Sequence, residues 1–240
     1  MTLAMLKRLP GPPISLPPRL TPHPTQESSP YISPLYSPHG NLDHIRASCS
    51  AQTFEILNDM YALTQAFLHR NDSIDTMTSS HYCRQIYERL LHPSSAQNSS
   101  TPDWIHRSVR LAALIYTDAI LHRTTFAVFT KRAYEDTTTS NTTLLCTLLH
   151  SMEHTDTNNC WGNMRGVFLW VCLMGGAASW ATGEAQDLQQ ASPSTTWARK
   201  CFSLWAIKAV VSTGFEHAEG MLEALRTGLR VKSLLEEKSA

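Results

Sequence analysis

Prolines are concentrated near one end of this chain. Ten of the 13 prolines lie between Pro10 and Pro38, in the run LPGPPISLPPRLTPHPTQESSPYISPLYSPHG. Proline removes a backbone donor and disfavours the helical conformation in the residue before it. We therefore predict a disordered Pro/Ser-rich tail with polyproline II character over residues 1–45. The remaining residues, 46–240, are numerous enough to form one helical domain with its own core.

The predicted tail carries two kinds of short motif. Lys7, Pro10 and Pro13 have the basic-x-x-P-x-x-P spacing that SH3-like domains bind. Serines that precede a proline are candidate phosphorylation sites; they are Ser29, Ser33 and Ser37. A Pro-rich tail of this length produces such matches by chance, so we assign no functional site to it.

Charge and cysteine spacing exclude two classes of site. The chain has 20 basic and 20 acidic side chains, whereas a protein that coats nucleic acid has a clustered basic excess. A structural zinc site takes cysteine pairs a few residues apart, and the six cysteines include no C-x2-C pair. The N-terminus lacks the apolar stretch of a secretory signal. We therefore expect a reducing compartment and free, mostly buried thiols.

From about residue 50 the apolar residues recur with the period of amphipathic helices. No alternating strand pattern and no internal repeat is found, so we predict an all-α, irregular multi-helix bundle. Ser50 is expected to cap the first helix and Thr101 the third, which has Pro102 in its first turn. The expected helices cover residues 50–68, 80–91, 102–123, 144–152, 166–183, 194–210 and 215–238. The residues expected in the core are Leu114, Ile115, Leu148, Trp170, Leu173, Gly175, Leu204, Trp205, Phe215, Leu222, Leu225 and Leu229.

One segment allows two interpretations. Residues Gly166 to Gly183 contain no charged side chain, and 18 positions are close to the shortest membrane span. The glycines Gly175 and Gly176 interrupt the segment, and each costs about 1 kcal/mol in helix propensity. A buried helix that a neighbour approaches closely at these glycines is the better explanation. A small membrane-associated protein anchored by residues 166–183 stays as the alternative.

A possible metal site is the string His150-Ser-Met-Glu153-His154. On a helix its two imidazoles lie on one face and could hold zinc, with Glu153 as a base. A third ligand would be needed, and nothing selects among the candidates Glu216, Glu219 and Glu223. We prefer a solvated helix end, so we assign no catalytic, metal or cofactor residues. With no G-x-S-x-G and no phosphate-binding glycine loop, we expect no enzymatic activity.

Several apolar segments follow one another in a familiar order. They read RLAALIYTDAILHR (110–123), GVFLWVCLMGGAAS (166–179), WARKCFSLWAIKAV (197–210) and FEHAEGMLEALRTGL (215–229). This order resembles the C-terminal regulatory region of fungal-specific transcription factors of the binuclear zinc-cluster type. The positions that carry the resemblance are Trp170, Val171, Gly175, Gly176, Trp197, Phe202, Trp205, Phe215 and Glu216.

The chain departs from the family pattern in two places. The six-cysteine DNA-binding cluster is missing, and Thr227-Gly228-Leu229 stands where a closing aromatic is expected. The resemblance therefore implies a nuclear, helical regulatory domain that acts through contacts with other proteins, a second copy of itself among the candidates, without direct DNA contact. A diverged or truncated regulator, a fragment of a longer product and a free-standing interaction module are all compatible with it.

Overall fold

The computed structural model describes residues 30–69, 76–92, 102–130, 143–180 and 192–237. Within these ranges the protein is all-α, as predicted, and no strand is formed beyond an isolated bridge between Ser33 and Tyr36. The helices are η1 (Asp43–Ser48), α1 (Ala51–Leu68), α2 (Thr76–Leu91), α3 (Trp104–His122), α4 (Phe126–Thr130), α5 (Leu144–Glu153), η2 (Gly162–Met164), α6 (Arg165–Ala178), α8 (Pro193–Ser212), η3 (Phe215–His217) and α9 (Ala218–Glu236).

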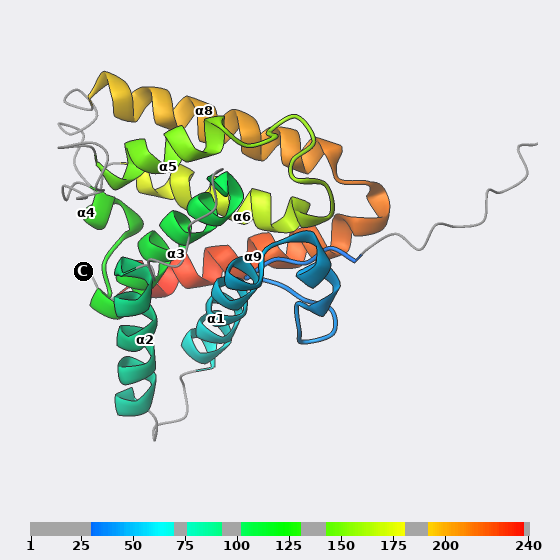
Figure 1. Ribbon diagram of the computed structural model, residues 1–240. Helices are drawn as coiled ribbons and strands as arrows, with labels where there is room; N and C mark the ends of the chain where they lie inside the picture. Colours follow the sequence, from blue (N-terminus) through cyan, green and yellow to red (C-terminus); the bar gives the residue numbers. More distant parts are fainter. Residues whose placement is uncertain (1–29, 70–75, 93–101, 131–142, 181–191, 238–240) are drawn as a thin grey trace, which may run out of the picture.

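The helices are arranged around α3, which passes through the middle of the molecule (Figure 1). It contacts α1, α2, α4, α5 and α6, and its central residues Leu111 to Ala119 are all buried. On one side α8 packs across α5 and α6, and on the other side α9 packs against α1. A helix that is apolar on every side is expected at the centre of a bundle, and α3 takes that place.

Side-chain caps define where the main helices begin. The Ser50 hydroxyl accepts a hydrogen bond from the Thr53 amide at 3.3 Å, which confirms Ser50 as the cap of α1. The cap of α3 is Asp103, whose carboxylate accepts from the His106 amide at 2.9 Å. The prediction of Thr101 as this cap is wrong, since a carboxylate two residues further on satisfies the free amides and also complements the positive end of the helix.

Residues 30–48, which we call the strap, are packed against the helices. The expectation of a disordered tail is corrected for residues 30–45, while residues 1–29, including Lys7, Pro10, Pro13 and Ser29, lie outside the described residues. The buried side chains of the strap are Tyr31, Ile32, Leu35, Leu42 and Ile45. Ser33 is only 1% exposed, so it is not the accessible serine that was predicted. Prolines prevent a helix here, but they do not prevent apolar side chains from entering a core.

The strap approaches the backbone of two helices at glycines. A Cβ atom on Gly166, at the start of α6, would overlap the backbone carbonyl of Ile32. A Cβ atom on Gly220, in α9, would lie 2.9 Å from the Tyr36 ring and 3.2 Å from Cβ of Tyr31. Each distance is shorter than an ordinary van der Waals contact. The strap therefore holds α6 and α9 together at positions where only glycine fits without a shift.

The predicted core is correct in the middle of the molecule and partly wrong near its C-terminus. Leu114, Ile115, Leu148 and Trp170 are fully buried, and Gly175 is buried with them. Leu173, Trp205 and Leu225 are half-buried and pack against the core. The incorrectly placed residues are exposed: Leu204 by 65%, Leu222 by 47%, Leu229 by 64% and Phe215 completely.

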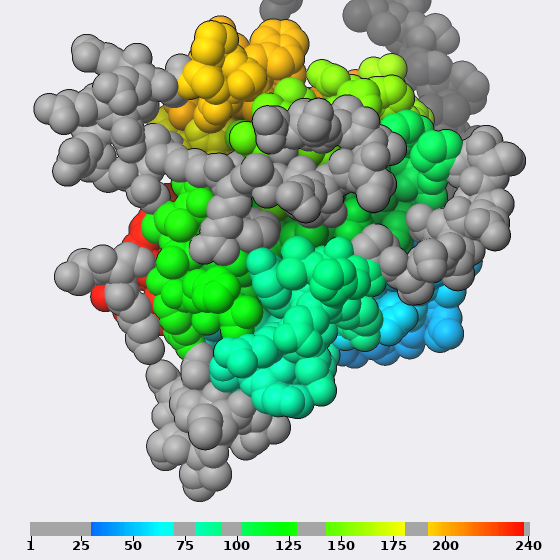
Figure 2. Space-filling model, turned by 60° about the vertical axis from the view of Figure 1, so that its left-hand side comes forward, coloured from blue at the N-terminus to red at the C-terminus, as the bar shows by residue number. Residues whose placement is uncertain are grey.

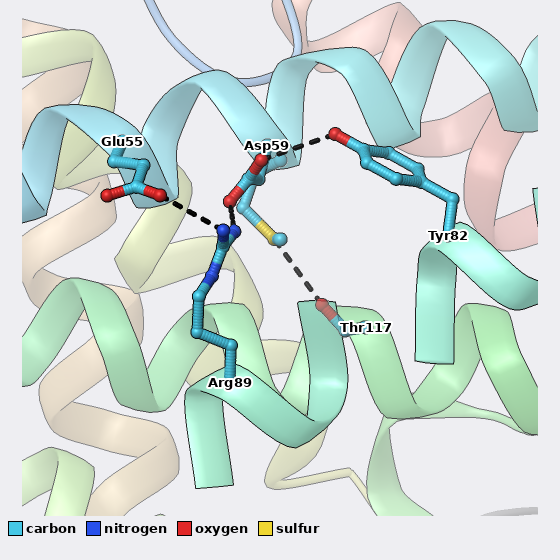
Figure 3. A network of polar contacts seen from close by, with 6 residues as sticks. Glu55, Asp59, Tyr82, Arg89 and Thr117 are labelled. Carbon is cyan, nitrogen blue, oxygen red and sulfur yellow. Dashed lines mark hydrogen bonds and ion pairs between the residues drawn. The ribbon is translucent and has the colours of Figure 1, made fainter. Parts of the chain in front are cut away.

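A polar network joins α1 to α2 (Figure 3). Arg89 on α2 contacts Glu55 at 3.0 Å and forms an ion pair with Asp59, both on α1. Tyr82 donates a hydrogen bond of 3.2 Å to the same Asp59 carboxylate. Because Arg89 and Glu55 are about half exposed, such pairs contribute at most about 1 kcal/mol each. The network therefore fixes the register of two helices more than it stabilises the fold.

The apolar segment forms a core helix of 14 residues, α6, which spans Arg165–Ala178. Ten of its residues are buried against neighbouring helices, whereas 181–183 lie outside the described residues. Across the described part of the chain, no helix combines the length and the hydropathy that crossing a membrane requires.

Candidate functional site

The most distinctive surface is an apolar stripe along α8. It consists of Trp197, Leu204, Ile207 and Val211, which we call the α8 stripe. Their exposed fractions are 57%, 65%, 59% and 79%. The spacing of seven, three and four residues places all four on one side of the helix. Single exposed apolar residues are common on protein surfaces, but a row of large ones along one helix is typical of an interaction surface.

The opposite side of α8 is part of the core. Ala198, Phe202 and Ala209 are fully buried there, mainly where α8 packs on α6. The helix is therefore apolar on two opposite sides, with one side buried and the other open. The first turns of α8 project at the upper edge of the molecule in the view of Figure 2.

Basic side chains accompany the α8 stripe. Helix α8 contains Arg199, Lys200 and Lys208 but no aspartate or glutamate. Lys200 is exposed and lies between Trp197 and Leu204 on the same side of the helix. The Lys208 amine bonds to Oδ1 of Asn158 at 2.9 Å.

A carboxylate from α5 acts on Cys201, near the middle of this helix. Glu153 raises the pKa of the Cys201 thiol, although burial of the thiol is the larger cause of that rise. Glu153 is itself exposed. The charge around Cys201 is therefore mixed, and the basic excess belongs to α8 itself.

A cavity of about 640 Å³ lies between α4, α6, α8 and the end of α9. It is within the size range of pockets that bind drug-sized molecules. Its lining residues are Thr125, Phe126, Ala127, Cys172, Leu173, Gly176, Ala177, Trp180, Phe202, Ser203, Ala206, Lys232, Leu235 and Glu236. The walls are thus mainly apolar, and the two charged residues in the lining both come from α9.

Trp180 forms a fixed wall of this cavity. The Arg199 guanidinium carbon lies 4.3 Å from the centre of the Trp180 ring, in the range of a cation–π contact. The same guanidinium donates a hydrogen bond of 2.6 Å to the carbonyl oxygen of Ser179. Although 55% of Trp180 is exposed, its ring is therefore held in place beside the cavity.

Cys172 lines the cavity but is not suited to nucleophilic chemistry. Burial raises its pKa well above the ordinary value of a thiol, and Cys160 adds to the rise. A thiol has to lose its proton to become a nucleophile. The walls of the cavity therefore offer apolar contact to an occupant and not an activated cysteine.

The string from His150 to His154 forms an aromatic cluster at the end of α5. The His154 ring stacks on Trp104 with 4.4 Å between ring centres, and the His150 ring lies edge-on to His154 at 4.4 Å. Nδ1 of His154 bonds to the carbonyl oxygen of His150 at 2.8 Å. In the described ranges, no three His, Cys, Asp or Glu residues lie close enough together to hold a metal ion, so the possible third ligands Glu216, Glu219 and Glu223 are not brought to the string.

Sequence reasoning missed both the α8 stripe and the cavity. A helical projection of residues 193–212 does show two apolar sides, so the stripe has a signal in the sequence. The cavity has none, because its walls come from four separate segments of the chain. Comparison of the chain with protein-family models, with curated proteins and with solved structures finds no match.

Proposed function

We propose that this chain is a regulatory interaction module, of the kind found in fungal-specific transcription factors, that acts by binding another protein along α8. The observation that carries the proposal is the exposed α8 stripe. The order of apolar segments from Arg110 to Leu229, and the lack of a cysteine cluster for reading DNA, supply the transcriptional context by resemblance. Nuclear localisation is part of the same proposal.

The spacing of the stripe favours a helical partner. Trp197, Leu204 and Val211 are seven residues apart and Ile207 lies between the last two, which is the pattern of a seam between two helices. A partner helix with its own apolar stripe would cover these side chains by the helix-in-groove mode of recognition. Fully burying a large apolar side chain contributes about 1.5–3 kcal/mol, and the loss of freedom on association offsets part of this gain.

The charges favour a partner with carboxylates beside its apolar stripe. Lys200 lies within the α8 stripe, and α8 has no acidic residue to pair with it. In an antiparallel pairing of two copies centred on Leu204, Lys200 of one copy would face Lys208 of the other. A buried cation that meets another cation disfavours binding, whereas glutamate at that position favours it. We therefore assign the stripe to an acidic amphipathic helix and not to a second copy.

Synthetic peptides test this assignment. One amphipathic helical peptide has leucines in a heptad pattern flanked by glutamates, and its twin has lysines in place of the glutamates. We expect the full chain to bind the glutamate peptide at least about tenfold more tightly, a difference of about 1.4 kcal/mol. Leu204→Glu should abolish this binding. Leu229→Glu is the matched control, since Leu229 is equally exposed, at 64%, but lies on α9.

A charge exchange makes the peptide test sharper. Lys200→Glu should weaken binding of the glutamate peptide and strengthen binding of the lysine peptide. Equal binding of both peptides by the unmodified chain, or equal effects of Leu204→Glu and Leu229→Glu, contradicts the proposed partner. Sedimentation that shows a dimer which Leu204→Glu dissociates assigns the stripe to a second copy instead.

The regulatory role needs a separate measurement in cells. We expect the chain, fused to an unrelated DNA-binding domain, to change transcription of a reporter gene. Leu204→Glu should remove that change and Leu229→Glu should keep it. A fluorescent fusion that stays outside the nucleus, together with no effect on the reporter, refutes the transcriptional part of the proposal and leaves the peptide result to stand by itself.

A further inference from the structure

We propose that the cavity between α4, α6, α8 and α9 binds one uncharged, mainly hydrocarbon small molecule. The proposal is independent of the protein partner, because the cavity is lined by Phe202, Ser203 and Ala206 of α8 and not by the residues of the α8 stripe. It rests on three features of the cavity: its free space, its apolar walls and the charge at its rim.

The free space reaches the backbone of α6. Apart from its chain neighbours and the backbone of its own helix, a Cβ atom added to Gly176 would meet no atom of the described residues within 4 Å, so these residues leave the floor of the cavity open at this glycine. The neighbouring Gly175 is in the opposite situation, because a Cβ atom there would lie 2.5 Å from the Phe202 ring. Consecutive glycines therefore have different roles: Gly175 permits helix packing, and Gly176 leaves room for an occupant.

The walls select an apolar occupant. Aromatic surface comes from Phe126, Trp180 and Phe202, and aliphatic surface from Leu173 and Leu235. Phe126 and Phe202 are buried, and Trp180 is held by Arg199. A site that is rigid before binding loses little conformational entropy when a ligand enters. A flat or aliphatic hydrocarbon body would gain contact with these walls and leave water.

The rim selects against a net charge on the ligand. Lys232 and Glu236 both line the cavity, and the Lys232 amine lies 3.6 Å from Oε1 of Glu236. An anionic group that is attracted to Lys232 would be repelled by Glu236. A cationic group that is attracted to Glu236 would be repelled by Lys232. A neutral hydroxyl or amide can hydrogen-bond to either residue. The Thr125 side chain also lines the cavity, and its buried hydroxyl has no hydrogen-bond partner among the described residues, so it can serve as a second polar contact.

Two fluorescent probes with the same ring system test both the site and its charge preference. N-phenyl-1-naphthylamine is uncharged, and 1-anilinonaphthalene-8-sulfonate adds a sulfonate to the same body. We expect the full chain to bind one molecule of the neutral probe saturably, with energy transfer from tryptophan, and at least about tenfold more tightly than the sulfonate. Equal or tighter binding of the sulfonate contradicts the inferred ligand class.

Substitutions at one glycine locate the probe. Gly176→Leu should fill the floor of the cavity and lower affinity for the neutral probe at least about tenfold. Gly176→Ala, which changes the same helix position but adds only a methyl group, should bind within about twofold of the unmodified chain. Ala206→Leu fills the cavity from α8 and gives the same test if Gly176→Leu does not fold. Unchanged binding in folded filling variants, or no saturable binding by the unmodified chain, overturns the proposal.

Discussion

The contact between α6 and α8 depends on the missing side chain at Gly175, and Gly175→Ala tests this dependence. The added Cβ would lie 2.5 Å from Cε1 and Cζ of Phe202 and 2.7 Å from Cδ1. Phe202 is fully buried, and the one free space beside its ring that the described residues leave is the cavity that it lines. Normal contact between carbon atoms needs about 3.5–4.0 Å. Either the ring or the whole of α8 has to shift by about 1 Å.

The size of the effect is set by two opposing contributions. Overpacking a core costs about 1–3 kcal/mol, and contact with three atoms of the Phe202 ring favours the upper part of that range. Replacing glycine by alanine within a helix gains up to about 1 kcal/mol. The net loss for Gly175→Ala is therefore about 1–2 kcal/mol, or a decrease of about 2–8 °C in melting temperature for a domain of this size.

The neighbouring glycine supplies the control. Gly176→Ala has the same gain in helix propensity, but beyond its own helix its methyl group would meet no atom of the described residues within 4 Å. We expect it to be as stable as the unmodified chain or up to about 1 kcal/mol more stable. The difference between the two alanine variants, measured by urea unfolding followed by circular dichroism, should be about 2–3 kcal/mol.

A second substitution identifies the cause. Phe202→Leu shortens the side chain that obstructs the new methyl group, so it should cost less in the Gly175→Ala background than in the unmodified chain. Such a coupling is expected only for residues in contact. If Gly175→Ala proves as stable as Gly176→Ala, or if the two changes are additive, the close approach of α6 and α8 at this glycine is refuted.

Three further predictions concern the strap, a buried histidine and the thiols. Gly166→Ala should destabilise the protein and speed proteolysis of the strap, because the new methyl group would overlap the Ile32 carbonyl, which is backbone and cannot rotate away; unchanged proteolysis would refute the contact. Burial lowers the pKa of His106 below its usual value near 6.5, so the unfolded chain binds a proton more readily than the folded one. The free energy of unfolding should therefore decrease as pH falls below about 6.5, and His106→Asn should show a smaller decrease. A thiol reagent followed by mass spectrometry should label half-buried Cys201 before buried Cys172, and the reverse order would contradict the assigned burial.

The buried side of a helix was predictable in two cases: where only one side of the helix is apolar, and where all of its sides are apolar. Helix α3 has an apolar centre, and the sequence pattern therefore identified Leu114 and Ile115 as core residues. Ser50 was predictable as a cap because its hydroxyl needs only a local amide. Such local signals do not depend on how the helices are placed in space.

The sides that α8 and α9 turn toward the core were not predictable, because small residues occupy much of their buried sides. Gly220 and Ala224 are buried in α9 while the larger Leu222 and Leu229 are exposed. A pattern analysis assigns the largest apolar residues to the core, as it did here. Close approach of the strap to α9 requires small residues instead, and this requirement comes from a distant part of the chain.

The strap shows a different limit of sequence reasoning. Proline content predicts the absence of regular secondary structure, and the strap indeed has only the short helix η1. Burial is a separate property that depends on apolar side chains such as Ile32 and Leu35. The alternation of these side chains with Ser-Pro pairs was the available signal, and the proline count concealed it.

The position of the strap also determines the order in which the molecule can be completed during synthesis. The ribosome makes the strap before its contact on α9, around Gly220, because synthesis runs from the N-terminal side. Until then Tyr31 and Tyr36 have no α9 to pack against. A nascent chain that stalls before α9 would keep these side chains exposed and become a substrate for chaperones or a starting point for aggregation. Packing of the strap against α9 therefore requires that translation has passed residue 220.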